Sequence, residues 1–209
     1  LLSTIKPSKM KRITQNFLLL FLIAGFAMLS SCEKDNISDT DFGIFSSQNE
    51  EIVIMNGAID SDTPQYWDNY VAAFPNTNQM IMKLCPGSDD DEANLIAARK
   101  IRLQNIAIHL PANAEIASGA VDLFLAGTTR TRESGSLIGV HSWSDGDNDA
   151  TAFPVGDANH LPYIEYYQEM GYSKSDAEAF YYFTINAAPA ADIHWMTDAE
   201  IAQYKLLTQ

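Results

Sequence analysis

Short apolar runs and longer amphipathic segments alternate along the chain from residue 51 onward. The apolar runs, several of them rich in β-branched residues, predict strands at residues 51–59, 79–85, 106–110 and 136–143. The other segments have helical periodicity and predict helices at residues 63–74, 88–105, 117–127, 159–170, 173–186 and 197–207. Strands that alternate with helices predict an α/β fold with a mostly parallel sheet, βαβ units and flanking helices.

Residues at the ends of three predicted helices support these assignments. Thr63 is the expected N-cap of the first helix, because Pro64 follows at the first helical position. The segment 88–105 opens with acidic residues and closes with basic residues, which suits the dipole of a helix. Thr197 and Glu200 have the spacing of a capping box at the start of the last helix.

An apolar run near the N-terminus has the length of a signal-peptide core. It covers residues 17–29 and is shorter than the ~20 residues that a membrane span needs. Lys11 and Arg12 precede it, and Met10 is the expected initiator. The sequence "LSSC", which ends at Cys32, resembles the lipobox of bacterial lipoproteins. The resemblance implies a lipid anchor on Cys32 and a place in the bacterial cell envelope, in the periplasm or on the outer surface. A plain secretory signal is the alternative.

The chain is therefore expected to have three parts. Residues 1–31 form the signal peptide, with the lipobox at residues 29–32. Residues 32–50 are polar and without hydrophobic period, which predicts a flexible tether. Residues 51–209 are enough for one domain with a sizeable core.

The charge balance excludes several classes of partner. The net charge is −14, and residues 1–31 contribute only basic residues, so the rest of the chain is more acidic still. Such a surface repels the phosphates of nucleic acids and anionic lipids, so the lipid on Cys32 would be the contact with a membrane.

The other cysteine is Cys85. With Cys32 lipidated, it lacks a partner for an internal disulfide and is expected to be a buried core residue. His109, His160 and His194 are expected to be structural.

One hydroxyl stands out among small residues. Ser118 lies between alanine and glycine at the start of the predicted helix 117–127. A catalytic serine needs a base, a group that orients the base, and N–H donors for the oxyanion. The free N–H groups and the dipole of a helix N-terminus would lie beside Ser118, and Gly119 would let a carbonyl approach the backbone. A helix N-cap or a tight packing contact is the alternative for Ser118.

Four motifs in order resemble the superfamily of the Clp protease proteolytic subunit (ClpP) and crotonase. They are "CPGS" at 85–88, "ASGAVDLFLAGTTR" at 117–130, "SLIGVHSW" at 136–143 and "WMTDAEIAQYKLLT" at 195–208. The likeness extends over residues 52–208 and is greatest to exported, stand-alone ClpP-like proteins. It implies a ClpP/crotonase-like fold and a serine peptidase that cleaves peptide bonds through an acyl-enzyme.

Carried over position by position, the resemblance assigns most of an active site. Ser118 matches the nucleophile, and His141 matches the general base at the end of a strand. The N–H of Gly119 and the turn at Gly87 and Ser88 match the oxyanion hole. Ser88 departs from the family pattern, which has a second glycine there, so the backbone angle of the turn is in question.

The resemblance places the third member of the catalytic triad just before the last helix. Asp192 is the nearest match, one residue out of register, and it would hold the tautomer of His141. Asp145, Asp147 and Asp157 in the loop after His141 are alternative acids, and a backbone carbonyl or water is another substitute.

The resemblance also bears on partners. It implies a peptide or protein substrate, no cofactor and no metal, and the acidic stretches 88–92 and 144–152 lack the spacing of a calcium loop. The family commonly self-associates, so the tyrosine-rich segment 163–183 is read as core, peptide groove or homo-oligomer contact. Two other functions remain open: a binding or scaffold protein that keeps the fold without turnover, and a protein that binds coenzyme A thioesters.

Overall fold

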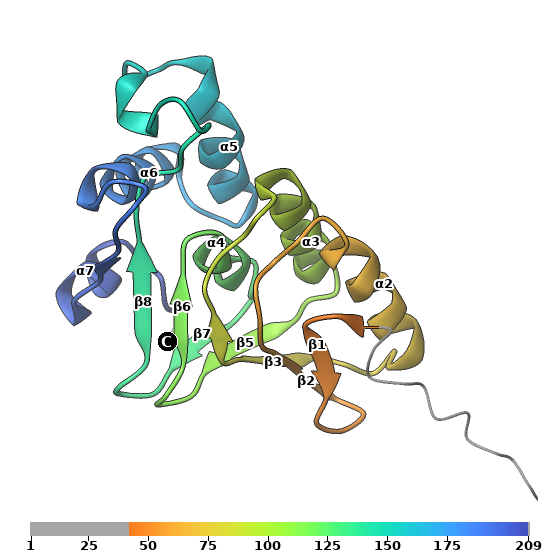
Figure 1. Ribbon diagram of the computed structural model, residues 1–209. Coiled ribbons are helices and arrows are strands. Elements are labelled where there is room, and N and C mark those ends of the chain that lie inside the picture. Colours follow the sequence, from red (N-terminus) through yellow and green to blue (C-terminus); the bar gives the residue numbers. More distant parts are fainter. Residues whose placement is uncertain (1–41, 209) are drawn as a thin grey trace, which may run out of the picture. The chain divides into compact units, whose positions relative to one another are not determined.

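The computed structural model describes residues 42–208 as an arrangement of two sheets and their covering helices (Figure 1). The predicted signal peptide at residues 1–31, Cys32, and the predicted tether as far as residue 41 lie outside the described residues. The prediction of a tether is wrong for residues 42–50, because they include strand β1 (Phe45–Ser47) and bury Phe42 and Phe45 in the core. Within the described part of the chain, no helix has both the length and the apolar character that a membrane crossing requires.

The first sheet has five strands in the order β1-β2-β3-β5-β7. These strands are β1 (Phe45–Ser47), β2 (Ile52–Met55), β3 (Gln79–Met82), β5 (Ala107–Leu110) and β7 (Arg130–Arg132). Only β1 runs antiparallel to its neighbour, and the other pairs of this sheet are parallel. Helix α2 connects β2 to β3, and α3 lies between β3 and β5, so the sheet is built from βαβ units.

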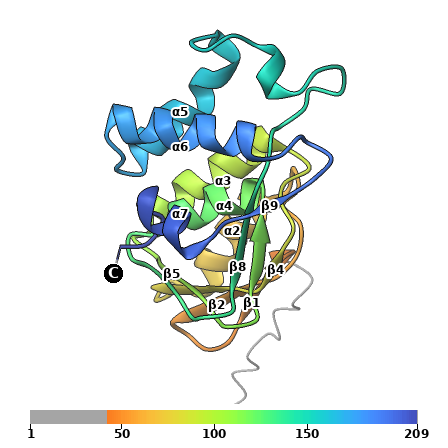
Figure 2. The same cartoon turned by 90° about the vertical axis from the view of Figure 1, so that its left-hand side faces the viewer.

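The second sheet has four strands in the order β4-β6-β8-β9. These strands are β4 (Leu84–Cys85), β6 (Glu115–Ala117), β8 (Leu137–Val140) and β9 (His194–Trp195). The first three are parallel, and β9 is antiparallel to β8. Each of β4, β6 and β8 directly follows a strand of the first sheet, so the chain passes from the first sheet to the second three times (Figures 1 and 2). The predicted α/β class with mostly parallel strands is confirmed.

Six α-helices and two short 3-10 helices occur between residues 42 and 208. They are α2 (Thr63–Ala73), α3 (Asp91–Leu103), α4 (Gly119–Leu125), η2 (Ala150–Ala152), η3 (Ala158–His160), α5 (Leu161–Glu169), α6 (Lys174–Ala187) and α7 (Asp198–Gln203). The capping box of Thr197 and Glu200 at the start of α7 is confirmed. Thr63 is not the N-cap of α2: Asp62 takes that position, and the Thr63 hydroxyl bonds to Asp60 instead.

The core lies between the sheets and the helices. Helices α2, α3 and α4 pack side by side, and α5 and α6 form a second helical layer beyond them (Figure 1). Cys85 is fully buried, with its sulfur 3.6 Å from the carbonyl oxygen of Met55, as expected for a core cysteine. Burial raises the pKa of its thiol to about 11, so the thiol stays protonated at neutral pH.

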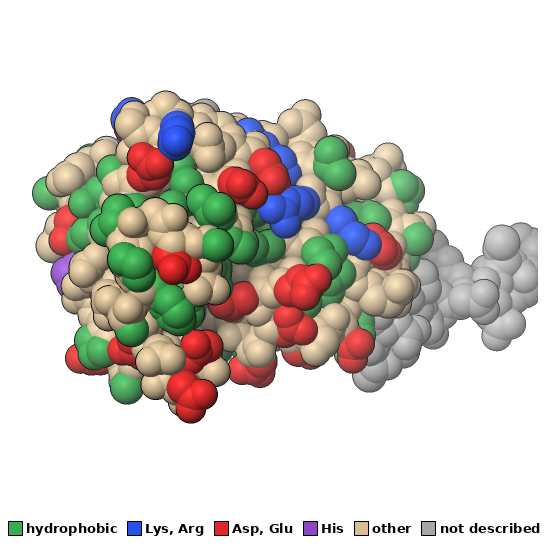
Figure 3. Space-filling view, turned by 90° about the horizontal axis from the view of Figure 1, so that it is seen from above, with side chains coloured by type: hydrophobic (Ala, Val, Ile, Leu, Met, Phe, Trp, Pro, Cys, Tyr) green, Lys and Arg blue, Asp and Glu red, His purple; other side chains and the backbone are tan. Residues whose placement is uncertain are grey.

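The charged surface reflects the acidic composition. On the face shown in Figure 3, acidic side chains are spread widely, whereas basic side chains are confined to one band. Two basic side chains of α3 are paired with acidic ones: Arg99 with Glu169, and Lys100 with Asp68. Acidic side chains therefore outweigh basic ones on this face, which leaves it with a negative charge.

Candidate active site

Ser118 lies at the junction between β6 and α4 in a strained conformation. Its φ is 53° and its ψ is −133°, which few residues other than glycine adopt. Its backbone is fixed on both sides, because its N–H donates to the Gly139 carbonyl at 3.0 Å and its carbonyl accepts from the Val121 N–H at 2.8 Å. Ser118 takes the N-cap position of α4, but its side chain makes no capping hydrogen bond. Its half-exposed hydroxyl is left for another role.

The predicted Pro-Gly-Ser turn lies directly against Ser118. Strand β4 pairs in register with β6, which brings the residues after the two strands together. A Cβ atom on Gly87 would lie 2.9 Å from Cβ and 3.4 Å from Oγ of Ser118. A Cβ atom on Gly119 would lie 2.2 Å from the Ser88 hydroxyl and 2.8 Å from the amide nitrogen of Asn94. Close approach therefore requires glycine at both positions, and at Gly87 the positive φ requires it as well.

Three backbone N–H groups near Ser118 are available as donors. Those of Gly87, Ser88 and Gly119 donate no hydrogen bond within residues 42–208. The turn itself is fixed, since the Ile59 N–H donates to the Gly87 carbonyl at 2.9 Å. Ser88 is not among the described residues with positive φ, so a serine fits where the family pattern has a second glycine. Gly87 carries the unusual angle, with a φ of 141°.

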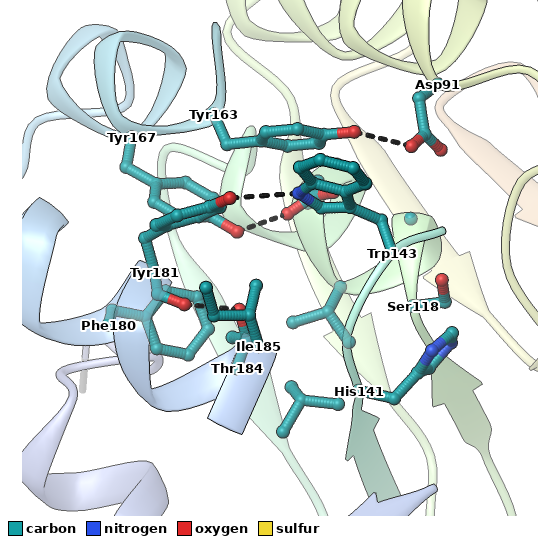
Figure 4. A pocket seen from close by; sticks show the side chains of 14 residues that line it. Asp91, Ser118, His141, Trp143, Tyr163, Tyr167, Phe180, Tyr181, Thr184 and Ile185 are labelled. Atoms are coloured by element: carbon teal, nitrogen blue, oxygen red, sulfur yellow. Dashed lines mark hydrogen bonds between the residues drawn. The ribbon is translucent and has the colours of Figure 1, made fainter. Parts of the chain in front are cut away.

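His141 follows β8 and lies next to Ser118. Strands β6 and β8 pair in parallel with Ala117 opposite Gly139, so the residues just beyond both strands meet at one edge. Both side chains line one pocket, and Figure 4 shows the Ser118 hydroxyl turned away from the imidazole ring. No hydrogen bond joins these two side chains in the described structure. Rotation about χ1 of Ser118 changes the direction of the hydroxyl, and such contacts are often looser without substrate.

A backbone carbonyl, and not a carboxylate, holds the ring of His141. Nδ1 lies 2.7 Å from the carbonyl oxygen of Ser142. A carbonyl only accepts, so Nδ1 carries the proton and Nε2 is left as the acceptor, which is the tautomer that a general base requires. The sequence carries no signal for this partner, because any residue type supplies a carbonyl.

The four acids considered from the sequence do not reach His141. Asp192 is exposed, and its Oδ1 accepts a hydrogen bond from the N–H of the next residue at 2.8 Å. Asp145 and Asp157 accept hydrogen bonds from backbone amides of their own loops. Asp147 likewise has no hydrogen bond to the imidazole, so within residues 42–208 the ring has no carboxylate partner. The role of Asp192 stays a prediction without a contact behind it.

The pocket beside Ser118 is lined by aromatic rings and two carboxylates. Its volume is about 40 Å³. The rings of Trp143, Tyr163 and Tyr181 form a stack in which neighbouring planes are within 19° of parallel. A hydrogen bond of 2.9 Å from the Trp143 indole to the Tyr181 hydroxyl fixes this stack (Figure 4). Asp91 and Asp122 supply the carboxylates, and the sequence analysis singled out neither.

The two carboxylates differ in their surroundings. Asp91 accepts from the hydroxyls of Ser88 and Tyr163, each at 2.6 Å. Asp122 is nine-tenths buried and accepts from the Tyr167 hydroxyl at 2.7 Å. Burial raises the pKa of Asp122 to about 7, against the opposing effect of that hydrogen bond, and the charge of Asp91 raises it further.

A wider groove begins at the same rings. It has a volume of about 520 Å³ and shares Asp91, Trp143 and Tyr163 with the pocket. Its other walls come from α3, η3 and the start of α5, and they combine apolar side chains with Glu92, Arg99 and Asn159. The small pocket therefore opens into a surface long enough for more than one residue of a bound chain.

The remaining histidines do not line this pocket, although His160 contacts Tyr181, which does. His160 is buried between the Tyr181 hydroxyl, 2.6 Å away, and the Phe153 carbonyl, 3.3 Å away. His109 bonds to Thr131 and His194 to Glu200, as expected for structural histidines. In the part of the chain that the structure describes, no group of three or more potential metal ligands occurs.

Comparison with known proteins finds similarity only among solved structures. No protein family and no curated protein matches the sequence. A mutant of the 1510-N membrane-bound stomatin-specific protease, in complex with a substrate peptide, is 21% identical, with a TM-score of 0.49 over 74% of this chain and 71% of that chain. A second mutant of that protease is 18% identical, with a TM-score of 0.49 over 74% of this chain and 75% of that chain. Neither likeness assigns an activity to this chain.

Proposed function

We propose that the chain is a serine peptidase of the ClpP type, with Ser118 as nucleophile and His141 as general base. The observation that carries the proposal is the conformation of Ser118: an uncapped, strained hydroxyl held between an imidazole and a turn with free N–H groups. Strain of this kind costs about 1–3 kcal/mol and persists at functional sites. The groove that begins at Trp143 supports an extended peptide as the substrate.

In the acylation step, Oγ of Ser118 attacks the carbonyl carbon of the peptide bond and gives its proton to Nε2 of His141. The carbonyl oxygen becomes an oxyanion, which the N–H groups of Gly119 and of the Gly87–Ser88 turn stabilise. The imidazolium then gives the proton to the leaving nitrogen, the C–N bond breaks, and an ester of Ser118 remains.

In the deacylation step, water attacks the ester carbon and gives a proton to His141. The C–O bond to Ser118 breaks, the serine takes that proton back, and the acid product leaves. The Ser142 carbonyl orients the ring through both steps but has no full charge to offset the imidazolium. We therefore expect slower turnover than from a triad with an ionised acid.

A fluorophosphonate probe tests the nucleophile. It should label the intact protein, and peptide mapping by mass spectrometry should place the adduct on Ser118. Ser118→Ala should abolish the label, whereas Ser144→Ala should keep it, because Ser144 lies in an exposed loop beyond His141. Label that persists in Ser118→Ala, or an adduct on another residue, would refute the proposal.

The second candidate is a peptide-binding protein without turnover. The outward Ser118 hydroxyl and the missing carboxylate behind His141 favour it. Fluorescence anisotropy with labelled peptides would detect binding, and mass spectrometry of the same mixture would show whether the peptides stay intact. Binding without cleavage, together with no fluorophosphonate adduct, would decide for this candidate.

We also propose that the protein is a lipoprotein of the bacterial cell envelope, anchored through Cys32. The apolar core at residues 17–29 and the "LSSC" sequence support this proposal. Radiolabelled palmitate should be incorporated into the full chain and into Cys85→Ala, but not into Cys32→Ala. Label that remains in Cys32→Ala would overturn it.

A further inference from the structure

The pocket beside Ser118 has the chemistry of a site for a positively charged side chain. Part of its wall is apolar, with Val140, Phe180 and Ile185 among the lining residues. The stacked rings of Trp143 and Tyr163 add flat faces against which an alkyl stem packs. The same faces attract a cation through their quadrupoles. Among the described residues that line the pocket, none is lysine or arginine.

Asp122 supplies an unpaired oxygen in this pocket. It lies four residues after Ser118, which places it about one helical turn, ~5.4 Å, along α4 from the nucleophile. Oδ1 accepts the Tyr167 hydroxyl, while Oδ2 makes no hydrogen bond with any atom of residues 42–208. An ionised carboxylate has room for several donors, and Oδ2 keeps contact with solvent, so a ligand in the pocket can reach it. The structure therefore leaves an acceptor that a ligand can satisfy.

Asp91 adds a second negative charge to the same wall. Each of its oxygens already accepts one hydroxyl, from Ser88 and from Tyr163. A second carboxylate near Asp122 makes the pocket less favourable for an anion or a neutral side chain and more favourable for a cation. The shared hydrogen bond to Ser88 also links this wall to the turn beside Ser118.

We propose that the pocket is the subsite for a lysine side chain on the acyl side of the scissile peptide bond, with the ammonium group bound by Asp122. The inference rests on the proposed hydrolase function. A volume of about 40 Å³ holds about three water-sized groups, which is room for the ammonium and the adjoining end of the stem but not for all five heavy atoms of a lysine side chain. An unbranched stem with a compact ammonium fits such a space better than the broad guanidinium of arginine.

The inference also predicts how the preference depends on pH. Several titratable groups on the surrounding elements face Asp122: Asp91 from α3, Tyr163, Tyr166 and Tyr167 from α5, Tyr181 from α6, and His141 after β8. Burial raises the pKa of all four tyrosines, so they stay neutral near pH 7. Lysine binding needs the ionised carboxylate, whose pKa burial raises to about 7. The preference should therefore grow as the pH rises through 7.

Two peptide diphenyl phosphonates test the subsite. They differ only in the side chain next to the phosphorus, which is lysine in one and norleucine in the other. Ser118 attack forms an Oγ–P bond and expels one phenolate, which takes the serine proton through His141. The lysine probe should label Ser118 at least ten times faster at pH 8, and the ratio should fall toward pH 6. Any pH dependence of the attack by Ser118 itself acts on both probes alike and cancels in the ratio.

Asp122→Asn keeps the shape of the side chain and the acceptor for Tyr167, and it should lower the lysine-to-norleucine ratio at least tenfold. Asp147→Asn is the matched control, since it removes the same charge from an exposed loop, and its ratio should stay at the wild-type value. Equal or faster labelling by norleucine in the wild-type protein would overturn the subsite, whether or not the variant folds. Labelling of Ser118 by neither probe would overturn the hydrolase proposal, and the subsite with it.

Discussion

Replacing Ser118 by glycine is expected to give a more stable protein than replacing it by alanine. Ser118 has a φ of 53° and a ψ of −133°, which costs a residue with a side chain about 1–3 kcal/mol and glycine little. Alanine keeps the Cβ atom and therefore the strain. At a position without such strain, glycine lowers the stability of the folded protein by roughly 0.5–1 kcal/mol relative to alanine. The two effects together leave the glycine variant ahead by about 1 kcal/mol.

Unfolding in guanidinium chloride, followed by far-UV circular dichroism, measures the difference in free energy. Scanning calorimetry should show the glycine variant melting about 2–4 °C above the alanine variant for a domain of this size. Both variants lack the hydroxyl, so turnover and self-cleavage contribute nothing to the difference. Ser144→Gly and Ser144→Ala are the matched pair, because Ser144 is exposed and is not among the described residues with positive φ.

At Ser144 the alanine variant should be the equal or the more stable of the two. The same order at Ser118 would refute the reasoning, because the positive φ would then carry no measurable strain. The proposal would lose the observation on which it depends most, since the conformation of Ser118 would no longer distinguish it from an ordinary helix start.

Three further changes test other parts of the site. Asp122 binds its proton more tightly when folded, so unfolding free energy should fall as the pH rises from about 4 to 7; Asp122→Asn should remove about 4 kcal/mol of that fall, measured by urea unfolding across the range. Gly87→Ala places a methyl group 2.9 Å from Cβ of Ser118 at a φ of 141°, so fluorophosphonate labelling should be lost and the melting temperature lowered; normal labelling would show that the turn is not tightly packed. In Ile193→Asp, the fluorophosphonate should label Ser118 about ten times faster than in the wild-type protein if the new carboxylate reaches His141. Slower labelling would count against His141 as the general base.

The sequence pattern predicts the long elements better than the short ones. All four predicted strands contain an observed strand, and helix α3 is correct apart from its first and last residues. The pattern misses β1, β6 and β7, which have three residues each, and β9, which has two, because so short a strand shows barely one cycle of alternation. It also joins β3 and β4, since it cannot show that the chain changes sheet between Met82 and Leu84.

The adjacency of Ser118 and His141 follows from simple topology. His141 lies near the end of the predicted strand 136–143 and Ser118 at the start of the predicted helix 117–127; the pairing of β6 with β8 brings them together, because the carboxyl ends of parallel strands meet at one edge of a sheet. The acid at Asp122 was not predictable in the same way. In the helical pattern of α4, a single aspartate indicates a side that faces solvent. In the structure, the layer formed by α5 and α6 covers Asp122, and the Tyr167 hydroxyl from α5 donates to its Oδ1.

The failure of Asp192 to reach His141 has a cause in strand register. Strand β9 pairs antiparallel to β8 with Trp195 opposite Gly139 and His194 opposite Val140. The next pair in the same register would set His141 opposite Ile193, and opposite residues direct their side chains to the same face. Asp192 is one position further and would direct its side chain to the other face, because a shift of one residue reverses direction in a strand. An offset of one residue from the family position therefore turns the carboxylate away from His141. The ring of His141 is held by the Ser142 carbonyl instead.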